Sequence, residues 1–257
     1  MFGSKMALGP FPLTAKIYYT LFGLDHFGLR VRAMHLGKLL GGLEPPRRIL
    51  DAGCSGGWYC FYLADRYPSA QVFGIDIDDL SLRNAEVIRQ RLSEGGTRIS
   101  FQKDDLVTFQ TNTPFDLICC IDVLEHIVED EVVLSNLRKA LDSRGLLLLH
   151  VPRKIESSPV MYKEHVREYT EAEILSRIKR AGFEIKKVVY TFGWSGSLGR
   201  KLYFKLQGIR LAPLRAILKG VMAPFLLLLA YGDTLSKNES HKQGLFVYAS
   251  PLRAKEA

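Results

Sequence analysis

The residues best suited to ligand chemistry follow two short apolar segments of the chain. Residues 48–57 read Arg-Ile-Leu-Asp-Ala-Gly-Cys-Ser-Gly-Gly, which predicts a strand that breaks into a glycine-rich turn before a helix near Trp58. A second apolar segment ends at Asp76. Glycines let a backbone approach a ligand closely, and a carboxylate at a neighbouring strand end accepts hydrogen bonds from ribose hydroxyls. The pattern therefore predicts a nucleotide-type ligand held across two strand ends of a parallel sheet.

The spacing of the glycines distinguishes between nucleotides. The dinucleotide fingerprint requires Gly-x-Gly-x-x-Gly, but in that register the chain has Gly53, Ser55 and Trp58. The run instead resembles the first motif of the Rossmann-like S-adenosylmethionine-dependent methyltransferases, Asp/Glu-x-Gly-x-Gly-x-Gly. Asp51, Gly53 and Gly57 match it, and Ser55 replaces the middle glycine. A glycine-rich turn between strand and helix also occurs in other α/β folds, so the motif alone leaves that alternative open.

Later segments extend the resemblance in the family's order, at 99–105, 115–126, 142–152, 165–170 and 181–185, with a last strand at 244–249. It covers about residues 46–192 and implies S-adenosylmethionine as the cofactor. It further implies that Asp76 binds the ribose, that Ile77 packs on adenine and that Asp105, or its neighbour Asp104, reads the adenine amino group. The full set of cofactor-binding residues that we expect is Asp51, Ala52, Gly53, Cys54, Ser55, Gly57, Asp76, Ile77, Asp105, Leu106 and Ile121.

Two histidines are the candidate catalytic residues. His126 and His165 lie where the family's loops converge above the cofactor, and a histidine near its ordinary pKa can take a proton from a phenol or alcohol. Asp122, Glu125 and His126 have i, i+3, i+4 spacing, so one helical turn would present them together. With His165 they resemble the Glu-x-x-Glu-His cation site of ubiquinone O-methyltransferases and of a small-RNA 2′-O-methyltransferase, Asp122 replacing the first glutamate.

The alternative is that Glu125 and His126 only cap and orient their loop, and we assign no metal on sequence alone. His150, which follows four leucines, is expected to be a buried histidine with satisfied hydrogen bonds. Tyr162 and Tyr169 are candidates for lining an acceptor pocket.

Strand and helix signals alternate from Arg48 onwards, which predicts an α/β fold with a parallel sheet covered on both faces. We expect strands near 48–52, 71–76, 99–103, 115–121, 145–151 and 184–191, and helices near 58–66, 80–93 and 130–141. Thr170-Glu-Ala-Glu173 is a capping box that opens one more helix. The resemblance implies a Rossmann-like, seven-stranded, mostly parallel sheet.

Flanking segments complete the predicted organisation. Residues 1–45 form an N-terminal cap with helices near 14–22 and 29–40, residues 46–192 the methyltransferase core, and residues 244–257 the last strand and tail. Between them, 193–243 is a basic, apolar insertion that contains the most apolar part of the chain. Its longest uncharged stretch, residues 220–232, is interrupted by Pro224 and is shorter than the ~20 residues that span a bilayer. We therefore expect a lid over the sheet or a membrane-surface helix rather than a transmembrane helix.

Charge is divided unevenly along the chain, whose net charge is +8. Residues 51–184 carry 16 basic and 22 acidic groups, whereas residues 185–232 carry 8 basic groups and no acid. Such a basic flank suits an anionic membrane surface, nucleic acid or an acidic substrate, although solvated helix faces give the same composition. The four cysteines lack zinc-site spacing, and we expect a reducing, cytoplasmic location.

Together these features predict an S-adenosylmethionine-dependent methyltransferase that acts on a small, lipophilic or membrane-associated acceptor, with peripheral contact to an anionic membrane. An RNA methyltransferase that uses the basic flanks is an alternative, but no RNA-binding module is recognisable. A protein that binds the cofactor without catalysis is another. An oxidoreductase is disfavoured because Trp58 stands in place of the third glycine.

Overall fold

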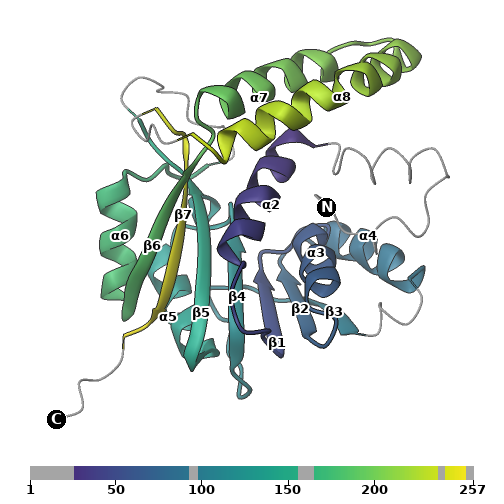
Figure 1. The fold of residues 1–257 in the computed structure, drawn as a ribbon. Coiled ribbons are helices and arrows are strands. Elements are labelled where there is room, and N and C mark those ends of the chain that lie inside the picture. Colours follow the sequence, from purple (N-terminus) through teal and green to yellow (C-terminus); the bar gives the residue numbers. More distant parts are fainter. Residues whose placement is uncertain (1–25, 93–97, 156–164, 237–240, 253–257) are drawn as a thin grey trace.

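A seven-stranded sheet forms the centre of the molecule in the computed structural model, which describes residues 26–92, 98–155, 165–236 and 241–252. Its strand order is β3-β2-β1-β4-β5-β7-β6 (Figure 1). Strands β1 to β5 run parallel, and β7 is antiparallel to both β5 and β6. The strands are β1 (Arg48–Ala52), β2 (Gln71–Asp76), β3 (Ile99–Lys103), β4 (Phe115–Ile121), β5 (Leu141–Pro152), β6 (Phe183–Thr191) and β7 (Gly244–Pro251).

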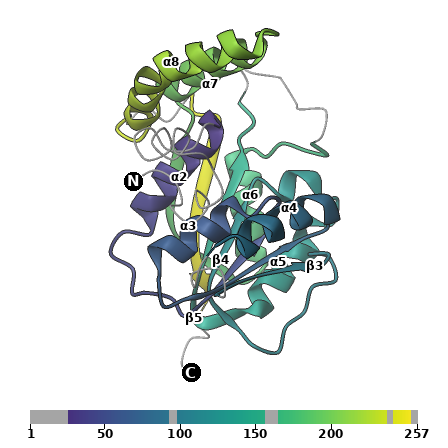
Figure 2. The ribbon, with the colours of Figure 1, turned by 90° about the vertical axis from the view of Figure 1, so that its right-hand side faces the viewer.

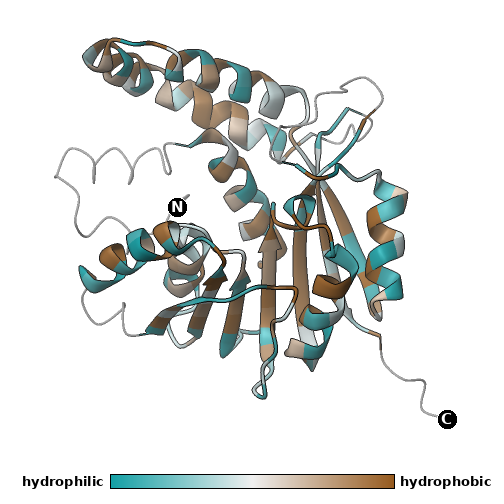
Figure 3. Ribbon diagram, turned by 180° about the vertical axis from the view of Figure 1, so that it is seen from behind, coloured by the Kyte–Doolittle hydropathy of each residue, from teal (hydrophilic) through white to brown (hydrophobic). Residues whose placement is uncertain are grey.

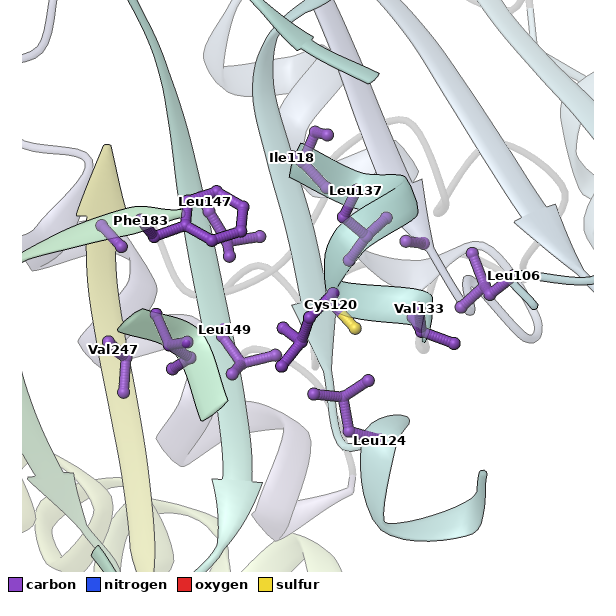
Figure 4. Packing of buried hydrophobic residues seen from close by; sticks show 14 of the residues in the cluster. Leu106, Ile118, Cys120, Leu124, Val133, Leu137, Leu147, Leu149, Phe183 and Val247 are labelled. Carbon is purple, nitrogen blue, oxygen red and sulfur yellow. The ribbon is translucent and has the colours of Figure 1, made fainter. Parts of the chain in front are cut away.

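Helices cover both faces of this sheet because the strands are apolar on both sides. Consecutive strand residues point to opposite faces, so Ile118 and Cys120 of β4 pack towards α5 and α6, whereas Leu117 and Cys119 pack towards α2 and α3. Figure 4 shows the first of these layers, and Figure 2 shows helices on either side of the sheet. The helices of the core are α2 (Phe27–Leu39), α3 (Trp58–Arg66), α4 (Asp79–Gln90), α5 (Asp130–Ala140) and α6 (Glu171–Arg180), with a short 3-10 helix at Leu124–His126.

The predicted fold class is confirmed, and most element boundaries agree to within a few residues. The capping box is present: the Thr170 hydroxyl accepts from the backbone N–H of Glu173, whose carboxylate accepts from that of Thr170. The fifth strand begins earlier than predicted, because Leu141 still pairs with Phe115 before the register shifts across the expected turn. Helix 14–22 lies outside the described residues.

Two helices fill the insertion between β6 and β7. These are α7 (Trp194–Gln207) and α8 (Ala212–Asp233), which we call the α7–α8 hairpin. It lies against α2 at one end of the molecule (Figure 1), and a third apolar cluster joins Phe27 and Val31 of α2 to Tyr203 of α7 and Leu226 of α8. The expectation that Pro224 interrupts the segment was wrong, because α8 continues through this residue over 22 residues. By length and composition alone, α8 is a candidate membrane span, with a mean hydropathy of 1.7 over its most apolar window.

Candidate functional site

The glycine-rich turn joins β1 to α3 at the carboxyl edge of the sheet. Gly53 and Gly57 have φ angles of 79° and 77°, which glycine adopts without strain. The neighbouring chain also excludes a side chain at both positions, since a Cβ on Gly53 would overlap Val123 and one on Gly57 would lie 2.7 Å from Cζ of Phe101. The backbone N–H groups of Gly53 and Cys54 both donate to the Ile75 carbonyl, at 2.8 and 2.9 Å, which fixes the turn against β2.

Asp76 lies at the end of β2 beside this turn, as predicted. Its Oδ2 accepts a 2.7 Å hydrogen bond from the Ser55 N–H, and its Oδ1 accepts one of 2.8 Å from the Asp78 N–H. Each oxygen keeps a second lone pair for a ligand hydroxyl. Ile77 follows with its side chain 66% exposed. A carboxylate beside an exposed apolar side chain fits the ribose and adenine of S-adenosylmethionine, so the residues present suit this cofactor.

The remaining predicted cofactor residues lie around the same edge. The Asp104 N–H donates to the Asp76 carbonyl at 3.1 Å, which brings the loop after β3 beside β2. Asp105 is half-buried, and its Oδ1 accepts from the Val107 N–H at 2.9 Å. Four other predicted residues are buried at this edge: Ala52, Cys54, Leu106 and Ile121. Whether each of these residues touches the cofactor stays a prediction.

Asp51 lies beneath the turn rather than on its surface. Its side chain is buried, and the Cys60 thiol contacts its Oδ2 at 3.2 Å. Burial raises the pKa of Asp51 to about 7, against the opposing effect of the Cys60 hydrogen bond and with a further contribution from the charge of Asp76. Asp51 therefore contacts α3 from inside the protein.

Two loops, the one after β4 and the one before α6, bring together a compact group of side chains that can transfer a proton or bind a metal. Ligand atoms of Glu125, His126 and His165 all lie within 4.8 Å of one another, and the two imidazole rings meet edge to face at 4.9 Å. Backbone N–H groups of Val166 and Arg167 donate to the Glu125 carbonyl, which joins the two loops. His126 is exposed. The two predicted histidines therefore lie together. Val123, in the loop after β4 that carries His126, packs against Gly53 of the glycine turn.

The Glu125 side chain does not cap this loop. It is fully buried, and neither carboxylate oxygen has a hydrogen-bond partner among the described residues. Burial, together with the nearby negative charge of Asp122, raises the pKa of Glu125 well above its usual range. A buried carboxylate without a donor, beside two imidazoles, fits a divalent cation with mixed oxygen and nitrogen ligands.

Asp122 does not join that group, in contrast to the four-residue set suggested by the i, i+3, i+4 spacing. A left-handed backbone conformation, with φ of 54°, precedes the short helix and directs its carboxylate elsewhere. Arg32 Nη1 lies 2.6 Å from Asp122 Oδ2, and His150 Nδ1 contacts Oδ1. Burial alone would raise the pKa of Asp122, but Arg32 and His150 hold it below its usual range.

The sequence analysis missed the role of Arg32. It lies on α2, donates from Nε to the Tyr59 hydroxyl at 3.1 Å and stacks over the Phe192 ring at 5.8 Å. Its sequence neighbourhood gave no signal that singled it out, because Arg30 and Lys38 lie in the same helix and the partners of Arg32 are distant in the chain. Arg32 therefore connects α2 to Asp122 at the end of β4 and to Phe192, which follows β6.

Two other expectations are decided by burial. His150 is 1% exposed and bonds to Asp122 and to the Thr191 hydroxyl, which confirms it as a satisfied buried histidine. Tyr169 does not line an accessible pocket, since it is 1% exposed and its hydroxyl donates to Asp130 at 2.6 Å. Tyr162 lies outside the described residues. A cavity of about 380 Å³ beside Asp116 and Arg144 lies at the amino-terminal end of β4, away from the glycine turn.

Comparison with known proteins agrees with this geometry. The profile of a family described as a methyltransferase domain matches residues 43–202, which is more than half of the chain. A ubiquinone biosynthesis O-methyltransferase of Idiomarina loihiensis is 33% identical over 101 residues, or 38% of this chain and 40% of that protein. A probable S-adenosylmethionine-dependent methyltransferase of Mycolicibacterium smegmatis is 25% identical over 58% of this chain and 57% of its own length. The chain thus spans less than two thirds of the length of these relatives.

Solved structures share the fold at low sequence identity. Coclaurine N-methyltransferase, bound to N-methylheliamine and S-adenosylhomocysteine, superposes with a TM-score of 0.62 at 14% identity, covering 86% of this chain and 72% of that one. An S-adenosylmethionine-dependent methyltransferase from Mesorhizobium loti superposes with a TM-score of 0.57 at 18% identity, covering 85% and 97%. With the family match and the nucleoside-type site, these comparisons show that the chain belongs to the Rossmann-like S-adenosylmethionine-dependent methyltransferase family.

Proposed function

We propose that this protein transfers a methyl group from S-adenosylmethionine to a small, lipophilic acceptor held in or at a membrane. The observation that carries the proposal is an exposed apolar face on the α7–α8 hairpin, at the carboxyl edge of the sheet. The hairpin begins at Trp194, three residues after the end of β6 at Thr191. An acceptor that partitions into an apolar phase could therefore reach the site from the side of the hairpin.

The chain's part in the reaction would be mainly positional. The bound cofactor supplies an electrophilic methyl group on a good leaving group. Asp76 would hold its ribose, while Ile77 and Asp105 would hold its adenine. Fixing two reactants in the correct orientation contributes up to ~7–11 kcal/mol of a barrier, which leaves little covalent chemistry for the protein.

On the acceptor side, His126 would remove the proton. It is exposed, and its loop packs against the cofactor turn through Val123. His165 would orient His126 through their edge-to-face contact. If a divalent cation is used, Glu125, His126 and His165 would hold it, and it would lower the pKa of an acceptor hydroxyl.

The activities of named relatives support a small-molecule acceptor but differ in its polarity. One group acts in ubiquinone biosynthesis, whereas a relative from Methylobacterium nodulans, 29% identical over 44% of this chain, is a trans-aconitate 2-methyltransferase. The cytoplasmic location also remains a proposal, supported by four buried cysteines that are free thiols.

The acceptor class is tested with S-adenosylmethionine carrying a radiolabelled methyl group. The protein is incubated with a total lipid extract, with a water-soluble metabolite extract and with RNA, and the label is counted in each fraction. We expect label in the organic phase only, and none in the variant His126→Ala. Label confined to water-soluble metabolites or to RNA would refute the lipophilic acceptor.

A further inference from the structure

The α7–α8 hairpin has two apolar faces, and within the part of the chain that the structure describes only one of them is covered by other elements. Leu226, Leu229 and Ala230 of α8 are buried in a cluster with α2 and α7, and Ala223 is buried as well. The opposite side of the same helix is also apolar but lies in solvent. In Figure 3 the colouring by hydropathy marks α8 as predominantly apolar along its length. Packing among the described residues therefore does not account for the second face.

The exposed residues form a continuous stripe. Leu214, Ile217, Val221, Phe225 and Leu228 are spaced by three or four residues, which places them on one side of an α-helix. Their exposed fractions lie between 43% and 69%. At 1.5 Å per residue the stripe is about 21 Å long. Exposed apolar surfaces of this kind, rather than scattered single residues, mark interaction sites.

The charge of the hairpin identifies the partner. From Trp194 to Gly232 the chain carries no acidic residue and six basic ones: Arg200, Lys201, Lys205, Arg210, Arg215 and Lys219. Lys201 and Lys205 are exposed on α7, where Trp194 and Phe204 are exposed as well. The apolar stripe of α8 lies beside α7, whose charged residues are all basic. Such a surface is complementary to an anionic lipid surface, which offers acyl chains and negative headgroups together.

The contacts at the end of α8 favour a helix on the membrane surface over one that crosses it. Its 22 residues would extend about 33 Å, enough for a bilayer core of ~30 Å. However, Asp233 at its end is fully buried and accepts hydrogen bonds from the backbone N–H groups of Phe192 and Gly193. It also pairs with His35 of α2 at 3.0 Å. Crossing the membrane would require these contacts and the packed face of α8 to separate from the domain.

We propose that the exposed face of the α7–α8 hairpin docks on an anionic bilayer surface and keeps the methyltransferase domain attached to the membrane from one side. The hairpin continues directly from the sheet edge that carries the glycine turn, so docking places the catalytic edge next to the lipid. This inference rests on the proposed lipophilic acceptor for its purpose, but docking is measured without turnover.

The test is co-sedimentation of the full chain with vesicles of phosphatidylcholine alone and with vesicles that also contain phosphatidylglycerol, at low and moderate salt. We expect binding only to the anionic vesicles, weakened by salt. The double variant Val221→Ser/Leu228→Ser should lose at least about tenfold in vesicle affinity, because two of the most exposed stripe residues become polar. Lys201→Gln/Lys205→Gln should reduce the dependence on anionic lipid.

A matched control is Val87→Ser/Val132→Ser, which changes two exposed valines on α4 and α5. This control should bind vesicles like the wild type, and all variants should keep the wild-type affinity for S-adenosylhomocysteine. Equal vesicle binding by the stripe variant would overturn the proposal, as would absence of wild-type binding. Resistance of membrane-bound protein to alkaline extraction would show a span instead. A dimer that the stripe variant converts to a monomer, without vesicle binding, would assign the face to a second copy of the chain.

The acceptor assay separates the two proposals. A protein that docks on vesicles but methylates only water-soluble compounds would retain the docking surface and refute the lipophilic acceptor. A protein that methylates lipids but does not sediment with vesicles would retain the lipophilic acceptor and refute the docking surface.

Discussion

Substitution of Asp76 is the sharpest test of the cofactor site. Its carboxylate oxygens already accept hydrogen bonds from the Ser55 and Asp78 N–H groups, and each keeps a lone pair for a ribose hydroxyl. Two hydrogen bonds to a charged group contribute ~1.5–3 kcal/mol each, so Asp76→Ala should cost about 3–6 kcal/mol of binding free energy. At 1.36 kcal/mol for each tenfold change, the dissociation constant should rise about 10²- to 10⁴-fold.

Isothermal titration calorimetry with S-adenosylhomocysteine measures this directly. Asp76→Asn serves as a second variant because it keeps the volume and one oxygen, but its amide must face one of the two N–H donors. We expect it to bind more weakly than the wild type and more tightly than Asp76→Ala. Urea denaturation of each ligand-free variant separates a loss of ligand contacts from loosening of the turn. Wild-type affinity in Asp76→Ala would refute the assignment of the nucleoside site.

Two further substitutions test buried carboxylates. Glu125→Gln should change the free energy of unfolding of the metal-free protein little, because burial already raises the pKa of Glu125 and so favours its neutral form. It should also abolish any rise in melting temperature that Mn²⁺ or Zn²⁺ produces in the wild type, and an equal rise in both proteins would argue against the cation site. Asp51 has a folded-state pKa of about 7, well above the ~3.9 of an unfolded chain, so the native state binds more protons between these values. Stability should therefore fall as pH rises from about 4 to 8, and Asp51→Asn should flatten this slope in urea titrations at several pH values. An unchanged slope would show that Asp51 is ionised in the folded protein.

Some features of this protein are local in the sequence and were predictable from it. The apolar runs at 48–52 and 115–121, the turn glycines and the Thr170 capping box each depend on residues within a few positions of one another. Asp76 could be placed beside the glycine turn because parallel strands present their carboxyl ends at one edge. His126 and His165 were brought together by the order of segments in the resembling family rather than by spacing.

Other features depend on contacts between distant residues, and the sequence could not decide them. The spacing of Asp122, Glu125 and His126 suggested one ligand set, but the left-handed backbone at Asp122 directs its carboxylate to Arg32 and His150. Tyr169 was a candidate pocket residue by sequence, but the fold buries its side chain and its hydroxyl donates a hydrogen bond to Asp130.

The hairpin shows the same division. Its sequence determined that residues 211–231 are apolar and that the surrounding segment lacks acids, because composition is a property of the chain alone. Whether that apolar surface lies inside or outside depends on what packs against it. Only the tertiary structure decided that α2 and α7 cover one side of α8 and leave the side of Val221 and Leu228 to solvent. A helix that is apolar on more than one side does not encode which side is buried, since the neighbours that bury it are supplied by other parts of the fold.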